Sequence, residues 1–394
     1  MLRLPLLAAA WLVMFSSCLA VAAQPNTLSQ EVLAEGWILL FDGETTFGWK
    51  AESKADWSVK DGAIHVSSGE PGLLRTTTQF ADYELKADFR AAKGTNSGLF
   101  LRTAPVLNKD GVTTQCYELN IAPSDNPFPT GSFVGRKKAE PVTEKPDEWR
   151  TFHVIAEGAR LTVKLDGEEV LTYEDPKPLG RGFIGLQLNS GAVEFRNLKL
   201  KPLGLASLFN GKDLTGWKTY PNLVSKFTVT EQGEINVKNG TGMLESVGQY
   251  ADFALQLECI SHAKGLNSGL FFRCIPGETM NGYECQIHNG FKDDDRTQPA
   301  DCGTGGFFRR QNARRVVAND LEWFHLTLLT SGPHMSAWVN GIQVSDWTDT
   351  RKPDPNPRRG LRVEKGTLMI QGHDPTTDLS FRNLRAGELT KRRP

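Results

Sequence analysis

The stretch that decides the fold is KGLNSGLFFRCIPGETMNGYECQIH, residues 264–288. It contains two strand-like runs joined by a turn rich in glycine and proline. Successive side chains of a strand point to opposite faces of a sheet, so Glu284, Gln286 and His288 are predicted to share one face. A carboxylate, an amide and an imidazole are costly to place against an apolar core. The row therefore predicts a polar groove on one face of a β-sheet.

The same unit occurs earlier in the chain, as GTNSGLFLRTAP at 94–105 followed by CYELNIAP at 116–123. Further motifs recur in the same order: FDG and FNG (41–43, 209–211), GWK (48–50, 216–218), Trp149 and Trp323, DG and NG (166–167, 340–341), and FRNL (195–198, 381–384). The offset between copies drifts by loop-sized insertions, which indicates duplication of a whole domain. We predict an export signal at 1–23, a first domain at 35–202 and a second at 205–390.

The composition fits a turn-rich β protein of two domains. The chain has 394 residues, including 38 glycines, 21 prolines and nine tryptophans. Asp-Gly and Asn-Gly between alternating runs, at 166–167 and 340–341, are strong hairpin signals. We predict an all-β protein of two tandem antiparallel sandwiches of jelly-roll type. The 45 basic and 46 acidic residues nearly cancel, which removes the usual electrostatic case for a nucleic-acid partner.

The first residues have the pattern of an export signal. Arg3 precedes an apolar run at 4–15, and small residues at 20–23 offer a cleavage site. The expected location is therefore the periplasm or the extracellular space. An uncleaved membrane anchor and a lipoprotein attached at Cys18 are the alternatives. No other segment is long and apolar enough to cross a membrane, and the sequence leaves the oligomeric state open.

The cysteines have two interpretations. Five remain beyond the signal, namely Cys116, Cys259, Cys274, Cys285 and Cys302, and an odd number leaves at least one thiol outside any intramolecular pair. Those of the second half either fill its core or include one disulfide. No CxxC or CxxH spacing predicts a zinc site.

Taken together, the motif order resembles the 3-keto-disaccharide hydrolase family. The order runs FDG…GW, NSGLFLR, YE-x-[QN], a tryptophan at the head of a meander, an NG or DG turn, G-x-[IL]-x-[IL]-Q, and FRN. The resemblance covers almost all of the chain beyond the signal, twice. It implies a concanavalin-like jelly roll of exported bacterial proteins that acts on glycosides oxidised to a ketone at C3, with its sites on the concave sheet face.

On such a substrate the ketone acidifies the C2 proton, so one base can remove it while the C1 substituent leaves, and water can then add back. The reaction needs a base of near-neutral pKa, an acid for the leaving oxygen, and donors near the enolate. No clean pair of carboxylates for ordinary glycoside hydrolysis is evident. The alternative function is a non-catalytic, lectin-like carbohydrate-binding protein.

The second domain offers the catalytic candidates. His373 lies in the Gln-x-His that similar domains carry, and His288 shares the face of Glu284, so either histidine could be the base. Arg273 is expected to pair with Glu284 or to stabilise an oxyanion. The sugar-binding candidates are Asn267, Gln286, Gln371 and Arg310. The plainer interpretations are a cross-strand ion pair for Arg273 and turn or loop positions for the two histidines.

The first domain departs from this pattern. Asn120 replaces Gln286, and Gln187-Leu188-Asn189 replaces the late Gln-x-His, so the histidine is missing. The candidates kept there for binding substrate are Arg102, Glu118 and Gln187. We therefore expect this domain to bind sugar or to be structural.

The sequence requires no cofactor. Asp293, Asp294 and Asp295 suggest a divalent cation such as calcium, but they lack the D-x-D-x-D-G spacing, so a solvated acidic loop is favoured. The basic cluster of Arg309, Arg310, Arg314 and Arg315 is either a solvated face or a contact for an acidic partner or polysaccharide.

Overall fold

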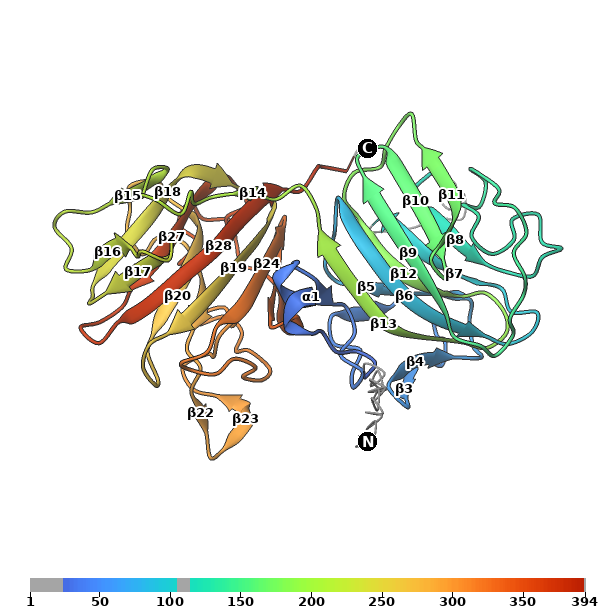
Figure 1. Cartoon of the computed structure of the whole chain (residues 1–394), viewed down its shortest axis with the longest axis horizontal. Helices are drawn as coiled ribbons and strands as arrows, with labels where there is room; N and C mark the ends of the chain where they lie inside the picture. The colour runs from blue at the N-terminus through green and yellow to red at the C-terminus, as the bar shows by residue number, and fades with distance from the viewer. Residues whose placement is uncertain (1–23, 105–113, 393–394) are drawn as a thin grey trace, which may run out of the picture.

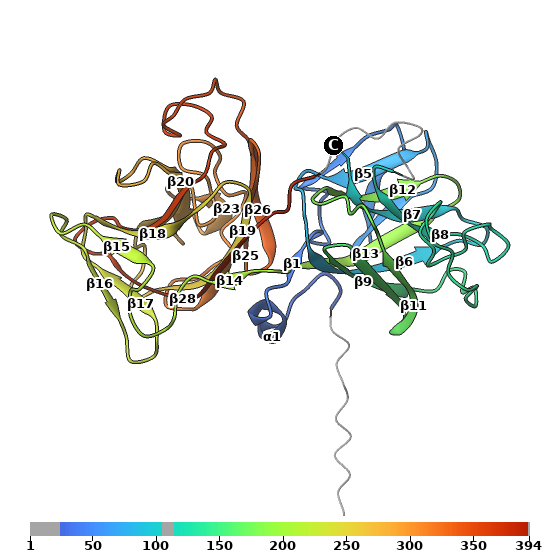
Figure 2. The same cartoon turned by 90° about the horizontal axis from the view of Figure 1, so that it is seen from above.

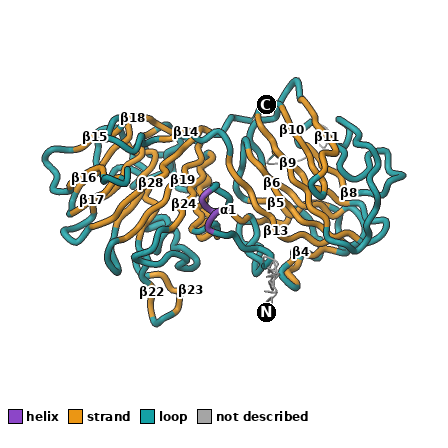
Figure 3. Tube along the Cα trace, viewed as in Figure 1, coloured by secondary structure: helices purple, strands orange, loops and turns teal. Residues whose placement is uncertain are grey.

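The chain forms two β-sandwiches that lie side by side (Figure 1, Figure 2). The structure is a computed structural model that describes residues 24–104 and 114–392, so the predicted signal and Cys18 lie outside the described residues. In this part of the chain strands and loops predominate (Figure 3), and the short helix α1 (Gln30–Ala34) begins after Ser29, whose side chain accepts a hydrogen bond from the Val32 amide. None of the described helices has the length and hydropathy to span a bilayer.

The first sandwich packs an eight-stranded sheet, of order β11-β10-β9-β6-β13-β4-β3 with β1 added on β13, against a five-stranded sheet of order β2-β5-β12-β7-β8. Its strands are β1 (Ile38–Leu39), β2 (Trp49–Ala51), β3 (Ser58–Lys60), β4 (Ala63–Val66), β5 (Gly72–Thr76), β6 (Tyr83–Ala91), β7 (Ser97–Thr103), β8 (Tyr117–Ile121), β9 (Arg150–Glu157), β10 (Arg160–Leu165), β11 (Glu168–Glu174), β12 (Phe183–Leu188) and β13 (Val193–Pro202).

The second sandwich repeats this topology, with sheets of order β16-β17-β28-β19-β24-β25-β26, with β14 added on β28, and β15-β18-β27-β20-β21. Its strands are β14 (Ala206–Ser207), β15 (Trp217–Thr219), β16 (Lys226–Val229), β17 (Ile235–Lys238), β18 (Gly242–Tyr250), β19 (Phe253–Ser261), β20 (Ser268–Cys274), β21 (Tyr283–Ile287), β24 (Phe324–Ser331), β25 (His334–Val339), β26 (Ile342–Thr348), β27 (Gly366–Gly372) and β28 (Asp378–Glu388), and a separate hairpin holds β22 (Phe291–Lys292) and β23 (Asp295–Pro299).

Alternation along the strands builds each core. In β6 every second residue from Tyr83 to Phe89 is buried, while the charged residues between them are half-buried. Each sandwich has its own cluster of buried apolar side chains contributed by both sheets. The predicted all-β, tandem jelly-roll architecture is confirmed.

The cysteines of the second half belong to its interior. Cys259, Cys274, Cys285 and Cys302 are all buried, and none of them forms a disulfide in the described structure. Cys259 and Cys285 pack within the second core. The core-filling interpretation of these cysteines is therefore confirmed.

The two sandwiches share a tightly packed joint around α1 and β1. The indole nitrogen of Trp338 donates to the Leu39 carbonyl at 2.9 Å. The Gln256 amide donates to the Gly36 carbonyl at 2.8 Å. Trp338 is also a member of the first sandwich's core cluster, although it lies on β25 of the second. The joint therefore extends one hydrophobic core across both halves.

Candidate active site

The candidate site lies on the outer face of the five-stranded sheet of the second sandwich. Along β21, Tyr283, Cys285 and Ile287 point into the core, which places Glu284 and Gln286 on the opposite face. The predicted sharing of one face by these two polar residues is confirmed. A small apolar cluster of Met243, Phe271, Cys274 and Met369 forms the floor beside them.

Glu284 is paired with an arginine that the sequence did not single out. Arg358, in the loop between β26 and β27, places its Nη2 2.9 Å from the Glu284 carboxylate, and its guanidinium lies 4.9 Å from the centre of the Phe271 ring. Burial raises the pKa of Glu284, and the positive charge of Arg358 opposes that rise. A Cβ on Gly269 would lie 2.9 Å from the Glu284 carboxylate, which explains the glycine of the NSG motif.

The predicted pairing of Arg273 with Glu284 is wrong. Arg273 has a φ of 49°, and the register of β20 against β27 shifts between Phe271 and Cys274. This β-bulge breaks the alternation on which the prediction relied. The fully buried guanidinium instead donates to the Ala251 and Arg362 carbonyls, at 2.8 and 3.0 Å, and to the Asp252 carboxylate at 3.2 Å.

Arg102 occupies the same structural position in the first sandwich. Its φ is also 49°, and its guanidinium donates to the Ala81 carbonyl, the Gly158 carbonyl and the Asp82 carboxylate at 2.7–2.8 Å. Only 1% of the Arg102 surface is exposed. Both arginines therefore fasten a bulged strand, which corrects the expectation that Arg102 lines a sugar site.

His373 forms a dyad with its sequence neighbour. Its Nδ1 lies 2.9 Å from the Asp374 carboxylate. That carboxylate also accepts hydrogen bonds from the amide and hydroxyl of Thr376, and these contacts together with His373 lower the pKa of Asp374. Leu368 and Ile370 of β27 belong to the second core, so Gln371 and, two residues further on, His373 continue the opposite face, which is also the face of Glu284. A carboxylate on one ring nitrogen leaves Nε2 available as a base.

Buried amides line the same face. The Gln286 side chain donates to Asn267 at 2.8 Å and to Asp301 at 3.3 Å, and Asn267 donates to Asp301 at 2.7 Å. The side-chain oxygens of Gln286 and Gln371 are buried and have no hydrogen-bond partner among the described residues. Both oxygens are covered by neighbouring atoms, so a sugar hydroxyl reaches either one only after a side chain moves.

His288 is held by its own turn. The Gly290 amide donates to its Nδ1 at 3.2 Å, and its backbone amide donates to the Thr304 hydroxyl at 2.9 Å. A Cβ on Gly290 would lie 2.6 Å from the His288 ring, so the turn packs closely against the imidazole. The hydrogen bond that the His288 ring accepts therefore lies within its own turn, whereas His373 pairs with the Asp374 carboxylate.

The first sandwich carries a partial copy of this site. Glu118 accepts a hydrogen bond from Gln187, and burial raises the pKa of Glu118 to about 7. Among the described residues no cation forms an ion pair with Glu118, because the loop at 176–181 is ten residues shorter than its counterpart at 350–365. The side-chain oxygens of Asn120 and Gln187 are buried without a partner in that part of the chain.

The acidic run at 293–295 and part of the basic cluster lie outside the candidate site. The Asp295 carboxylate accepts hydrogen bonds from Thr297 and Gln298 within its hairpin. In residues 24–104 and 114–392 no three His, Cys, Asp or Glu side chains are grouped to hold a metal ion. Arg314 and Arg315 pair with Asp42 of the first sandwich at 2.6 and 3.2 Å, so the predicted basic cluster is divided between the joint and the site.

Three site residues were missed in the sequence. Arg358 lies in a loop without periodicity, and Asp301 lies far from Asn267 and Gln286 along the chain, so neither gave a signal. Asp374 could have been found, because a carboxylate directly after a candidate base is a natural partner for its ring.

A family model matches this chain twice, and several known proteins resemble it in sequence or structure. The model of the 3-keto-alpha-glucoside-1,2-lyase-like domain matches residues 36–201 and again 204–386. A 3-keto-disaccharide hydrolase of Bacteroides thetaiotaomicron is 26% identical over 46% of this chain and 83% of its own length. A candidate glycosyl hydrolase of Parabacteroides distasonis aligns with a TM-score of 0.41 at 22% identity, covering 46% of this chain and all of its own. A carbohydrate-binding module of Bacillus subtilis gives 0.31 at 16%, over 39% of this chain and 95% of the module. The chain belongs to the carbohydrate-active family of 3-keto-alpha-glucoside-1,2-lyase-like domains, of which it carries two copies.

Proposed function

We propose that the second sandwich cleaves glycosides whose sugar ring carries a ketone at C3. The observation that carries this proposal is the placement of Glu284, Arg358 and the His373–Asp374 dyad on one sheet face. Gln286 and Gln371 add amide groups to that face, a kind of group that binds sugar hydroxyls. The name of the Bacteroides relative, a 3-keto-disaccharide hydrolase, supports the choice of substrate.

His373 is the proposed base for the C2 proton. Asp374 holds its Nδ1, so Nε2 accepts the proton as the C2–H bond breaks. The electron pair of that bond moves toward the C3 ketone to give an enolate. When the enolate collapses, a C1–C2 double bond forms and the C1–O bond to the leaving group breaks.

Glu284 and Arg358 are placed to stabilise the negative charges that develop on the leaving oxygen and on the enolate. Burial of Glu284 favours its protonated form, which can donate a proton to the leaving oxygen. Arg358 brings a positive charge to the same place, where it can stabilise the enolate oxygen. Water then adds to C1, its released proton passes to the Glu284 carboxylate, and the proton on His373 returns to C2, which completes a net hydrolysis.

Turnover of a 3-keto disaccharide by the purified chain tests this assignment. We expect His373→Ala to lower kcat by about 100-fold or more, as for loss of a general base, and His288→Ala to keep near wild-type turnover. Release of the free sugar and of the enediol absorbance is followed with and without a chelator, which also tests for a divalent cation. Full turnover by both His373→Ala and Glu284→Gln would refute the site.

We propose that the first sandwich binds sugar without cleaving it. Asn189 stands at the position of His373, so the base is absent, while Glu118 and Gln187 keep polar groups on the equivalent face. A non-catalytic, lectin-like role for the whole chain is the second candidate function. It predicts sugar binding without turnover in the assay above.

We also propose that the protein is exported. Arg3, the apolar run at 4–15 and the small residues at 20–23 support this location. N-terminal sequencing of the protein recovered from a periplasmic or culture fraction tests it, with cleavage at 20–23 as the expected result.

A further inference from the structure

We propose that the site of the second sandwich selects glycosides that carry an anionic group, a carboxylate or a sulfonate or sulfate, and that Arg310 binds this group. The inference rests on the proposed function, because it takes the occupant of the site to be a glycoside. It adds the charge of that glycoside and the residue that recognises it.

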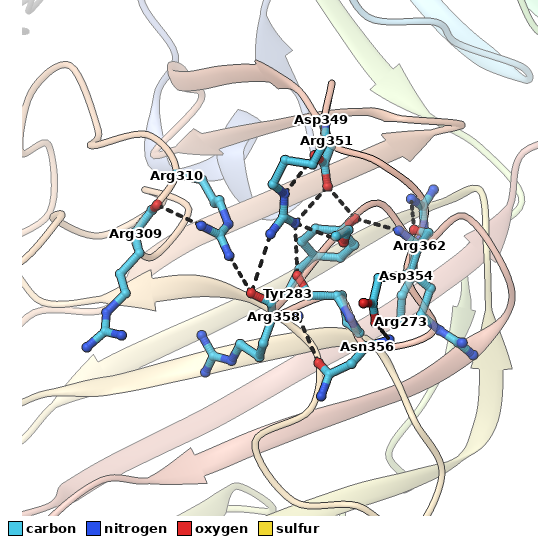
Figure 4. A network of polar contacts seen from close by, with 12 residues as sticks. Arg273, Tyr283, Arg309, Arg310, Asp349, Arg351, Asp354, Asn356, Arg358 and Arg362 are labelled. Carbon is cyan, nitrogen blue, oxygen red and sulfur yellow. Dashed lines mark hydrogen bonds and ion pairs between the residues drawn. The ribbon is translucent and has the colours of Figure 1, made fainter.

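Arg310 has no acidic partner among the described residues. Its guanidinium donates to the Arg309 carbonyl at 3.2 Å and to the Arg358 carbonyl at 2.8 Å, as the dashed lines in Figure 4 show. Among residues 24–104 and 114–392 no carboxylate forms an ion pair with it. Two of its N–H groups are used, and the others remain available to a ligand.

The equivalent arginine of the first sandwich shows what Arg310 lacks. Arg136 follows Phe133 in a bridged turn, just as Arg310 follows Phe307. Arg136 is paired with Asp175 at 3.2 Å and lies over the Tyr117 ring. At this position of the first sandwich the arginine therefore has a carboxylate partner and stabilises the fold.

In the second sandwich a different arginine takes the aspartate. Asp349 is the counterpart of Asp175, since Tyr283 donates to Asp349 as Tyr117 donates to Asp175. Arg351 makes a two-point contact with Asp349 at 2.8 and 2.9 Å. The residue at the corresponding position of the first sandwich is Lys177. Where the first sandwich has Lys177, the second has Arg351, and Arg351 occupies the Asp349 carboxylate. Arg310 is therefore left without the aspartate that its counterpart Arg136 binds.

The surroundings of Arg310 are rich in arginine. Partial burial and the charges of Arg351 and Arg358 lower the pKa of Arg310, although the charge of Asp349 opposes them. Arg309 next to it is exposed and likewise forms no ion pair with any described residue. Figure 4 shows Arg309, Arg310 and Arg358 together on one side of the network. An oxyanion bound there would offset this repulsion and accept charge-assisted hydrogen bonds.

The anion site adjoins the catalytic candidates. Arg358 joins them, because its carbonyl accepts from Arg310 while its guanidinium pairs with Glu284 at 2.9 Å. Met280, whose carbonyl accepts from Arg358, is 44% exposed beside them and offers apolar surface to an aglycone. A glycoside with its ring at Glu284 can therefore extend a charged substituent to Arg310.

The experiment compares aryl 3-keto-glucosides that differ in one para substituent, a carboxylate, a sulfonate or a neutral carboxamide. We expect the wild type to prefer a charged aglycone by about tenfold in kcat/KM, and 0.5 M salt to reduce this preference. A 3-keto-glucuronoside with a neutral aglycone distinguishes an anion on the ring from one on the leaving group. Equal kcat/KM for every charged and neutral member would overturn the proposal.

Two variants assign the effect to Arg310. Arg310→Gln is expected to abolish the preference by lowering kcat/KM for the charged substrates about tenfold more than for the carboxamide. Arg359→Gln, which removes the neighbour of Arg358 in the loop between β26 and β27, an arginine whose side chain is 72% exposed, is expected to keep the preference. A parallel loss for charged and neutral substrates in Arg310→Gln would show a structural role and contradict the proposal.

A binding arm separates this inference from the proposed function. If the wild type turns over none of these compounds, the proposed chemistry fails, and calorimetry with the corresponding non-oxidised glucosides decides the anion site alone. Tighter binding of the carboxylate than of the carboxamide, lost in Arg310→Gln, supports the site. Equal binding of the two glucosides refutes it.

Discussion

At the scale of single residues, two glutamates at the same strand position have opposite surroundings. Glu284 is paired with Arg358, whereas Glu118 is buried beside Gln187 without a described cation. Burial disfavours the charged form of a carboxyl, and a nearby guanidinium favours it. The two sandwiches therefore provide an internal comparison of a compensated and an uncompensated acid.

We predict that Glu118→Gln stabilises the protein at pH 8. The pKa of Glu118 rises from 4.5 to about 7 on folding, so the folded state binds the proton more tightly than the unfolded state. The contribution of Glu118 to stability is present below pH 4.5 and is lost as the pH rises through 7. The loss is about 3 kcal/mol above that pH. In unfolding by denaturant, the Glu118→Gln variant should match the wild type at pH 4 and exceed it at pH 8.

Glu284→Gln is the matched control for that measurement. It removes the charge partner of Arg358 and leaves a half-buried guanidinium without its carboxylate. We expect this variant to be less stable than the wild type at pH 8. A gain in stability for both variants, or for neither, would contradict the comparison.

The polar row of the site could be predicted because it follows a period of two. Glu284 and Gln286 alternate with Cys285 and Ile287, and this pattern alone assigns their face. Arg358 could not be found in this way, because it lies in an irregular loop with no counterpart at 176–181. The placement of Arg273 failed for a related reason, since a bulge is invisible to a rule that assumes an unbroken strand.

At the scale of elements, the same bulge occurs in β7 and β20 and is fastened in the same manner. Arg102 and Arg273 both have a positive φ and both bind a backbone carbonyl and an aspartate near the start of β6 or β19. The buried guanidinium therefore links the five-stranded sheet to the eight-stranded sheet behind it. This link between the sheets is present in both sandwiches, although the polar residues on the outer face of the five-stranded sheet differ between them.

We predict that Arg273→Met lowers stability without lowering the turnover of folded protein. The substitution removes the buried contacts to Ala251, Asp252 and Arg362, and loss of such a partner destabilises by about 3 kcal/mol. The midpoint of thermal unfolding measures the first effect, and kcat/KM per folded molecule at low temperature measures the second. Arg102→Met is the matched variant in the first sandwich and should lose a similar amount of stability. A fall in kcat for Arg273→Met at temperatures where the protein is fully folded would restore Arg273 to the site.

At the scale of the whole molecule, the repeat and the jelly roll followed from the sequence, but the joint did not. The motif order and the turn spacing are local signals, so they indicate two similar sandwiches. The joint consists of contacts between residues about 300 positions apart, such as Trp338 with Leu39, and no periodicity records such a pair. Asp42 also reaches across to Arg314, from a loop that the sequence marks only as a turn.

The shared core predicts that the two sandwiches unfold together. Trp338 is 1% exposed, its ring lies 6.5 Å from that of Phe80, and it belongs to the core cluster of the first sandwich. Calorimetry of the wild type should therefore show one transition. Trp338→Phe removes the hydrogen bond to Leu39 and part of the packing at the joint. We expect it to weaken the free energy of interaction between the two sandwiches by about 2 kcal/mol. We expect this variant to show two resolved transitions.

Trp347→Phe is the control, because Trp347 packs against Tyr283 within the second core and does not belong to the first. It should lower the midpoint while keeping a single transition, since the coupling between the sandwiches is intact. Two transitions in the wild type would mean that the joint is too weak to couple the folds. A single, unshifted transition in Trp338→Phe would mean that the coupling resides in the ion pairs of Asp42 with Arg314 and Arg315. In that case lowering the pH through the depressed pKa of Asp42 should separate the transitions instead, because the stabilising charge of that carboxylate is lost on protonation.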